Sequence, residues 1–287
     1  MKPTLVGIHP RPEWLVKLTR DYDRGRASKE QLENGFIRAE QELKSLQTRW
    51  GFEPAIDGLF RWQDMFRPLT QSIDGVEAGP LTRFFDNNTF YRKPLVKGLR
   101  YRGGVPFSGE KLILPGPYTF YVLSEVEMSK ESFYRGLLEV YKEMIDDLKP
   151  RTTQLNEPAL VYRYKKWEVD EVDYDWVSTF AKELNASVHL YFGDPSEAYV
   201  FLAEREVPEI GLDLVEGPLL EDLGVPVTLG VVDGRNTYME DLNHLIRVVT
   251  SFQDVRHVAP NCDLEFLPYE YAKRKMALLH ALVEVLS

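Results

Sequence analysis

The feature that most constrains the fold of this chain is a regular alternation of short apolar runs with longer stretches of helical periodicity. Apolar runs of four or five residues are typical of strands that are buried on both faces of a parallel sheet. The predicted strands cover residues 4–8, 55–58, 111–115, 152–155, 187–191, 210–214, 227–231 and 256–259. Helical patterns cover 12–49, with a break near Gly25, and then 130–148, 174–184, 240–251 and 268–286. The order along the chain is therefore strand, helix, strand, helix.

Eight such units in 287 residues match the usual size of a (β/α)8 barrel. A doubly wound open sheet is the alternative for the same α/β pattern. The barrel is favoured because polar residues follow strand after strand, and the carboxyl ends of barrel strands meet at one face. Residues 75–106 fit no strand–helix unit and predict a β-hairpin inserted after the second strand. Since no linker divides the chain, residues 1–287 are expected to form a single TIM-barrel domain.

The charge balance and the cysteine content exclude several classes of protein. With 45 acidic against 35 basic residues, the net charge of -10 argues against a nucleic-acid partner, because phosphate binding depends on Lys and Arg. The only cysteine, Cys262, allows neither a disulfide within the chain nor a cysteine-rich metal site, so we expect a reducing, cytoplasmic location. No apolar run approaches the roughly 20 residues that cross a bilayer, and no membrane association is expected.

Polar side chains at the predicted strand ends form the candidate site. Glu157 follows the fourth strand, His189 lies in the fifth and Asp233 follows the seventh. Histidine titrates near neutral pH, so His189 could act as a general base with Glu157 or Asp233 as the acid or the orienting group. Taken alone, each residue also has a structural interpretation: a core histidine, a turn aspartate and, for Cys262, an inert buried thiol. Their occurrence at successive strand ends favours a site.

The motifs at these positions resemble those of the cobalamin-independent methionine synthases. The ordered motifs are Gly-Leu-Phe-Arg-Trp-Gln-Asp-Met at 58–65, Leu-Pro-Gly-Pro-Tyr-Thr at 114–119, Asn-Glu-Pro-Ala-Leu at 156–160, His-Leu-Tyr-Phe-Gly at 189–193, Gly-Val-Val-Asp-Gly-Arg-Asn at 230–236 and Pro-Asn-Cys at 260–262. The resemblance implies a (β/α)8 barrel from a family that moves a methyl group from a methylfolate to homocysteine. Full-length members have two similar barrels, and the C-terminal one holds the catalytic zinc. This chain has the length of one barrel and resembles the N-terminal, zinc-free one.

The resemblance implies an incomplete zinc site. The catalytic barrel of the family binds zinc through a histidine, a cysteine two residues later, a glutamate at the next strand end and a second cysteine after the last strand. His189 and Cys262 match two of these ligands, whereas Tyr191 occupies the first cysteine position. The glutamate position falls on Val215, or on Glu216 if the register slips by one. We therefore expect no cofactor in this chain, and any zinc would have only the pair His189 and Cys262.

The resemblance also implies substrate-binding residues. Arg11 and Lys17 stand where the family's N-terminal barrel has basic residues that point to the glutamate tail of the folate, although solvated charges at a helix start explain them equally well. Leu59 replaces the family's homocysteine-binding glutamate, which indicates a redirected pocket. The other candidates for substrate binding are Asn156, Asp213, Arg235 and Asn236.

Three functions remain open on the sequence. The first is a component of methionine synthase that works with a separate zinc-bearing barrel, homocysteine and a methyl donor, which is a folate, a pterin or a corrinoid protein. The second is an independent zinc-free enzyme that uses the barrel pocket. The third is a non-catalytic binding or regulatory barrel, because fold alone does not fix function.

Overall fold

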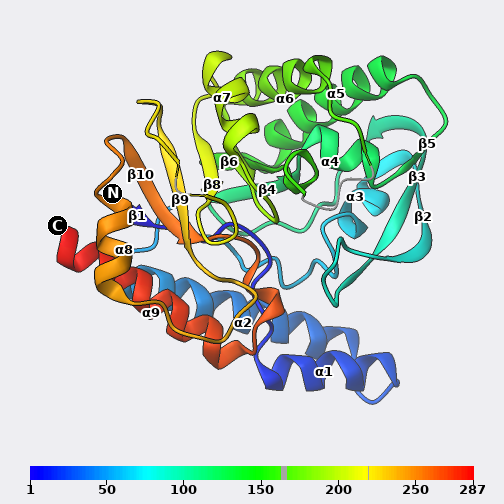
Figure 1. Ribbon diagram of the computed structural model, residues 1–287. Helices are drawn as coiled ribbons and strands as arrows, with labels where there is room; N and C mark the ends of the chain where they lie inside the picture. The colour runs from blue at the N-terminus through cyan, green and yellow to red at the C-terminus, as the bar shows by residue number, and fades with distance from the viewer. Residues whose placement is uncertain (163–166, 219) are drawn as a thin grey trace.

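A curled parallel sheet forms the centre of the molecule (Figure 1). The computed structural model describes residues 1–162, 167–218 and 220–287. Its main sheet has the strand order β1-β10-β9-β8-β7-β6-β4, and every neighbouring pair is parallel. The strands are β1 (Lys2–Pro3), β4 (Lys111–Pro115), β6 (Thr152–Asn156), β7 (Ala186–Leu190), β8 (Ile210–Asp213), β9 (Val227–Val232) and β10 (Val255–Pro260). From β4 onward, the predicted strands are confirmed to within one residue at each end.

The prediction of a regular second strand at 55–58 is wrong. Its backbone groups are bound largely by side chains instead of by a strand ladder. The amide of Gln47 donates to the carbonyl of Ile56 and accepts from its N–H, at 2.8 and 3.0 Å. The carboxylate of Glu110 accepts from the N–H of Ala55 at 3.1 Å. Because these groups are satisfied from the side, the segment forms no regular ladder.

The same segment nevertheless closes the wall of the barrel between β1 and β4. Three backbone N–H groups carry the links: that of Glu53 donates to the carbonyl of Pro3, that of His9 to Gly58 and that of Glu110 to Ala55. The predicted first strand at 4–8 is wrong, because β1 covers only residues 2–3; further along, the N–H of Ile8 donates to the side chain of Asp263 instead of to a neighbouring strand. The fold is therefore a TIM-type α/β barrel in which one position of the wall is irregular.

Helices cover the outside of this sheet (Figure 1). Those expected from the sequence are α1 (Glu13–Asp23), α2 (Lys29–Arg49), α5 (Lys130–Leu148), α6 (Glu171–Glu183), α8 (Leu242–Val249) and α9 (Tyr269–Leu286). The predicted break between α1 and α2 is confirmed, since Gly25 has a φ of 68° and Ser28 caps α2. Three short helices were not predicted, α3 (Arg67–Ser72), α4 (Pro117–Val122) and α7 (Ser196–Glu204), because so few turns show little periodicity.

A small second sheet lies beside the barrel. β2 (Ile73–Arg83) pairs antiparallel with β3 (Phe90–Tyr101), and β5 (Glu125–Val126) adds parallel to β3. The paired strands occupy most of the interval 75–106 in which the sequence predicts a hairpin. In the described ranges, no helix is both long and apolar enough to cross a membrane.

Candidate functional site

The ends of four barrel strands meet at Asn261, which directly follows β10. Its carbonyl accepts a hydrogen bond from His189 Nε2 at 3.0 Å, and its Nδ2 donates to both oxygens of Asp213 at 3.2 and 3.1 Å. Its Oδ1 accepts from the N–H of Gly234 at 2.9 Å. The structure thus brings the ends of β7, β8, β9 and β10 together, as parallel strands in a barrel require.

Asp213 is a structural acceptor at this face. Besides Asn261, it accepts from the N–H groups of Phe192, Val215 and Glu216, at 3.3, 3.0 and 3.0 Å. Burial raises its pKa to about 6, an effect that these hydrogen bonds oppose. Its oxygens therefore hold the loops after β7 and β8 in place.

Glu157 caps a helix. One carboxylate oxygen accepts from the N–H of Tyr118 at 2.9 Å, and the other accepts from the N–H and the hydroxyl of Thr119 at 2.8 and 2.7 Å. These groups lie in the first turn of α4, where N–H groups lack partners within the helix. A Cβ at Gly116 would lie 2.2 Å from the Glu157 carboxyl carbon, so only glycine fits there. Burial raises the pKa of Glu157 to about 7.

His189 and Cys262, the two residues that match zinc ligands, are bound to backbone instead. Since a carbonyl can only accept, Nε2 of His189 carries the hydrogen in its bond to Asn261, and burial lowers the pKa of the ring to about 4. The thiol of Cys262 lies 3.6 Å from the carbonyl of Asp263, and burial raises its pKa well above the usual value. Among the residues that the structure describes, no group of three or more His, Cys, Asp or Glu is placed to hold a metal ion.

Asn156 belongs to a buried polar chain inside the barrel. Its Nδ2 donates to the carbonyl of Val6 at 3.1 Å, and its Oδ1 accepts from Gln154 at 2.6 Å. Gln154 in turn accepts from the ammonium group of Lys111 at 3.0 Å, which also donates to Thr4. Burial lowers the pKa of Lys111 to about 7. Asn156 therefore joins the first strand region to β6.

The turn after β9 connects the β2–β3 hairpin to the barrel through side-chain contacts of Arg235. Arg235 forms an ion pair with Glu216 and donates to Asp86 and Asn87 at 3.3 and 3.2 Å. The neighbouring candidates serve the turn itself, since Asp233 accepts from the N–H of Arg235 and the exposed Asn236 accepts from the N–H of Tyr238. The cation of Arg235 is thus committed to side chains of the protein.

Aromatic side chains fill the mouth of the barrel, and we call this cluster the aromatic plug. It consists of Phe84, Phe85, Tyr162, Trp167, Phe192 and Phe266. Phe85 comes from the hairpin turn and lies 5.6 Å from Phe192 and 4.8 Å from Tyr162 between ring centroids. The guanidinium of Arg235 covers Phe192 at 5.0 Å. The strand-end cluster is therefore closed over by the hairpin turn.

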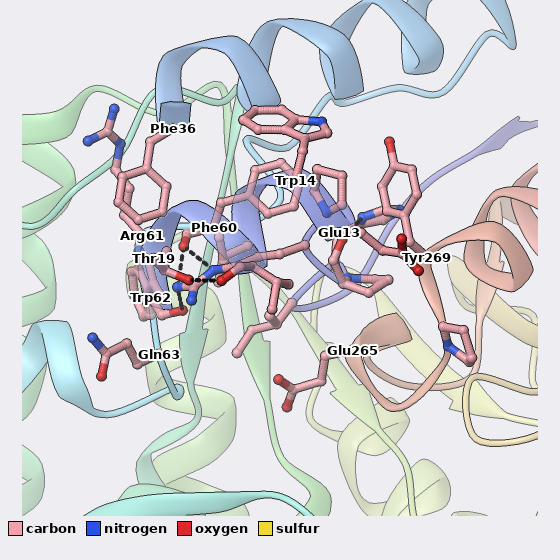
Figure 2. A pocket seen from close by; sticks show the side chains of 18 of the residues that line it. Glu13, Trp14, Thr19, Phe36, Phe60, Arg61, Trp62, Gln63, Glu265 and Tyr269 are labelled. Atoms are coloured by element: carbon pink, nitrogen blue, oxygen red, sulfur yellow. Dashed lines mark hydrogen bonds between the residues drawn. The ribbon is translucent and has the colours of Figure 1, made fainter. Parts of the chain in front are cut away.

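A large open pocket lies to one side of this mouth, and we call it the groove. It has a volume of about 1450 Å³ and is formed by residues 8–14 at the start of α1, by the loop 59–63, by residues 265–273 and by part of α2 (Figure 2). Of the predicted site residues, only Arg11 lines it. Its guanidinium donates to the carbonyl of Phe60 at 2.9 and 2.5 Å. Lys17 is exposed and does not line the groove.

The groove wall is aromatic and acidic. Trp14, Phe36, Phe60, Trp62 and Tyr269 line the groove together with Glu265, which lies below these rings in the view of Figure 2. Five carboxyl side chains line the groove against three basic ones. The basic groups are engaged, Arg11 with backbone carbonyls, Arg61 with Glu33 and Glu40, and Lys273 with Glu270. An anionic tail would therefore find little uncommitted positive charge here.

Sequence reasoning passed over Glu265 and the aromatic wall. Glu265 lies in a short 3-10 turn, η2 (Leu264–Phe266), between β10 and α9, where no periodicity marks it. His9, which follows the predicted strand 4–8, is likewise absent from the predicted site residues. The usable signal was the spacing of Asp263 and Glu265, two carboxyl groups two residues apart just beyond a strand end.

Comparison with known proteins places the chain in a family. Residues 108–257, more than half of the chain, match the model described as the cobalamin-independent synthase, N-terminal domain. The chain belongs to this family. It is 28% identical over 83% of its length to the 5-methyltetrahydropteroyltriglutamate–homocysteine methyltransferase of Thermosynechococcus vestitus, but it spans only 35% of that protein. It is 24% identical to a methionine synthase of Sulfolobus acidocaldarius, with 95% of this chain and 88% of that protein aligned.

The solved structures agree on the fold. A B12-independent methionine synthase from Shewanella sp. W3-18-1, determined with selenomethionine, superposes with a TM-score of 0.70 over 99% of this chain and 97% of that one, at 17% identity. The cobalamin-independent family includes zinc-bearing barrels, but the residues here do not fit a zinc site. His189 and Cys262 face backbone carbonyls, and Tyr191 carries a phenol where a thiolate would be needed.

Proposed function

We propose that this chain is a zinc-free component of a cobalamin-independent methionine synthase, which supports methyl transfer to homocysteine together with a separate zinc-bearing barrel. The match of residues 108–257 to the N-terminal domain of the family carries the proposal. The partner would supply the metal that converts the homocysteine thiol into a thiolate, the nucleophilic form. The methyl donor would be a folate, a pterin or a corrinoid protein.

The burial and the hydrogen bonds of His189 and Glu157 favour a non-catalytic, assisting role for this barrel. His189 would be needed as a general base in an independent enzyme, yet it is 1% exposed, its ring has a lowered pKa and Nε2 is bound to Asn261. Glu157 is fully buried and caps α4. A general base must reach the proton that it removes, and neither group reaches the groove.

A reconstitution assay tests the proposal. The purified chain, a zinc-bearing barrel of the family and the mixture of both are supplied with homocysteine and each methyl donor in turn, and methionine is measured. The expected result is no turnover by the chain alone and at least about a tenfold gain by the mixture over the zinc-bearing barrel. Full turnover by the chain alone, or no gain in the mixture with any donor, would contradict it.

A non-catalytic binding barrel is the second candidate, and the aromatic plug favours it. Phe84 and Phe85 occupy the face at which TIM-barrel enzymes bind their substrates. A binding barrel would bind a ligand in the groove without changing the turnover of any zinc-bearing homologue. The reconstitution assay therefore separates the two candidates.

A further inference from the structure

His9 lines the groove, and one of its ring nitrogens is a hydrogen-bond acceptor without a partner among the described residues. His9 is 2% exposed, and its Nδ1 lies 3.0 Å from the carbonyl of Pro10. A carbonyl can only accept, so Nδ1 carries the hydrogen. Burial lowers the pKa of His9 to about 4, which leaves the ring neutral at pH 7 and Nε2 an acceptor. Nε2 is buried and has no partner among the described residues, which is an unfavourable state for a polar atom.

A carboxyl group that lines the same groove, that of Glu265, also lacks a hydrogen-bonded partner in the part of the chain that the structure describes. The side chain of Glu265 forms no hydrogen bond or ion pair with any residue in the described ranges. The charged groups that act on it are Asp263 and Asp64, which repel a carboxylate, and Arg11, which attracts it. Burial, followed by the charges of Asp263 and Asp64, raises the pKa of Glu265. A cation placed beside it would reverse this effect.

The remaining wall suits an apolar body. The ring of His9 stands edge-on to Phe60 and Tyr269, at 5.9 and 5.7 Å between centroids, and both of these rings line the groove. Aromatic rings attract cations through their faces, and here Lys273 already lies 5.6 Å from the centre of Tyr269. The lining of the groove therefore combines aromatic surface with hydrogen-bond acceptors that lack donors in the described part of the chain.

We propose that the groove binds a protonated amine carried on an apolar body, with His9 Nε2 and the Glu265 carboxylate accepting its N–H groups. His9 Nε2 needs a donor, the excess of carboxyl groups in the lining favours a positive charge, and a cation beside Glu265 would lower its raised pKa and leave it ionised. The apolar body would pack on Phe60 and Tyr269. This proposal is independent of the proposed role in methyl transfer, because its test measures ligand binding by this chain alone and needs no zinc-bearing barrel.

Three ligands of similar size test the charge preference at pH 7.5 by isothermal titration calorimetry. Phenethylamine carries only the ammonium group, L-phenylalanine carries the ammonium and a carboxylate, and 3-phenylpropionate carries only the carboxylate. We expect phenethylamine to bind at least about tenfold more tightly than 3-phenylpropionate, since the loss of one charged hydrogen bond raises a dissociation constant by about tenfold or more. If L-phenylalanine binds as tightly as phenethylamine, the source is an amino acid; if it binds more weakly, the source is a simple amine.

Two matched variants assign the binding to the inner wall. Glu265→Gln keeps the shape of the side chain but cannot form the carboxylate that a bound cation would favour, and it should weaken phenethylamine binding about tenfold. Glu270→Gln makes the same change at the exposed rim of the groove, where Glu270 already pairs with Lys273 at 3.4 Å, and should change binding less than about twofold. Equal binding of phenethylamine and 3-phenylpropionate, no binding of either amine, or an unchanged affinity in Glu265→Gln would overturn the proposal.

Discussion

The barrel mouth and the groove lie at the same end of the molecule and handle polar groups in opposite ways. At the mouth, Asp213, Asn261 and Glu157 have hydrogen-bond partners within the chain, and the aromatic plug covers them. In the groove, His9 Nε2 lacks a partner and Glu265 faces two other carboxyl groups. A satisfied polar network stabilises a fold, whereas unfilled acceptors beside an open cavity are available to a ligand. We therefore assign a structural role to the polar residues at the mouth and a ligand-binding role to those in the groove.

The largest effect on stability is expected at Asp213. Asp213→Ala would leave three backbone N–H groups and the amide of Asn261 without their acceptor, so the free energy of unfolding should fall by about 4 kcal/mol. Urea unfolding measures it. Asn236→Ala, in the exposed turn after β9, is the control and should cost less than about 0.5 kcal/mol. If both substitutions lower the free energy of unfolding equally, Asp213 is not a structural acceptor at the mouth.

The next effect is a pH dependence at Glu157. Its pKa is raised to about 7 in the folded chain, above the unfolded value of 4.5, so the folded state binds more protons between these values. The free energy of unfolding should therefore fall as the pH rises from about 5 to 7, by about 1 kcal/mol per unit from this group. Asp213 acts in the same direction at lower pH. The variant Glu157→Gln should show a shallower slope; an identical slope would mean that Glu157 does not titrate as a buried cap.

The sequence predicts six of the nine α-helices of the described residues and most strands because their patterns are local, and the main failures involve long-range partners. The segment 55–58 has the composition of a strand, but Gln47 and Glu110 satisfy its backbone from elsewhere in the chain. The strand ends were placed correctly, yet a sequence does not show that the partners of Glu157 are N–H groups of α4. Glu265 was missed because its importance depends on what faces it, not on its neighbours in the chain.

The plug should contribute less than the buried network. Phe85 is half-buried against Tyr162 and Phe192, and Phe85→Ala should lower the free energy of unfolding by about 2 kcal/mol. Phe90→Ala, at an exposed position of the same hairpin, should cost less than about 0.5 kcal/mol. If removing Phe85 is as mild as removing Phe90, the hairpin turn does not seal the mouth.

The contacts of Arg235 with Glu216 and with the hairpin turn should contribute less to stability still. Arg235→Gln removes the ion pair with Glu216 and the contacts to the hairpin turn, at half-buried positions, so about 1 kcal/mol is expected. Hydrogen exchange should rise mainly in residues 84–89, which these contacts hold. Arg83→Gln, an exposed change on the same hairpin, should leave exchange in this turn unaltered. Unchanged exchange in Arg235→Gln would show that the plug alone holds the turn.

The smallest effect on stability is expected in the groove. Glu265→Gln removes a carboxyl group that has no side-chain partner in the described residues, and the free energy of unfolding at pH 7.5 should stay within about 0.5 kcal/mol of the starting protein or rise slightly. Urea unfolding beside Asp213→Ala gives the direct contrast. A loss comparable to that of Asp213→Ala would mean that Glu265 is structural.

Hydrogen exchange of the full chain with and without saturating phenethylamine tests most directly whether binding belongs to the groove. We predict slower exchange in residues 8–14, 59–63 and 264–271, which form the groove, and no change in 189–193, 213–217 and 233–237 at the mouth. Protection of the mouth segments with no change in the groove would contradict the assignment of structure to one region and binding to the other.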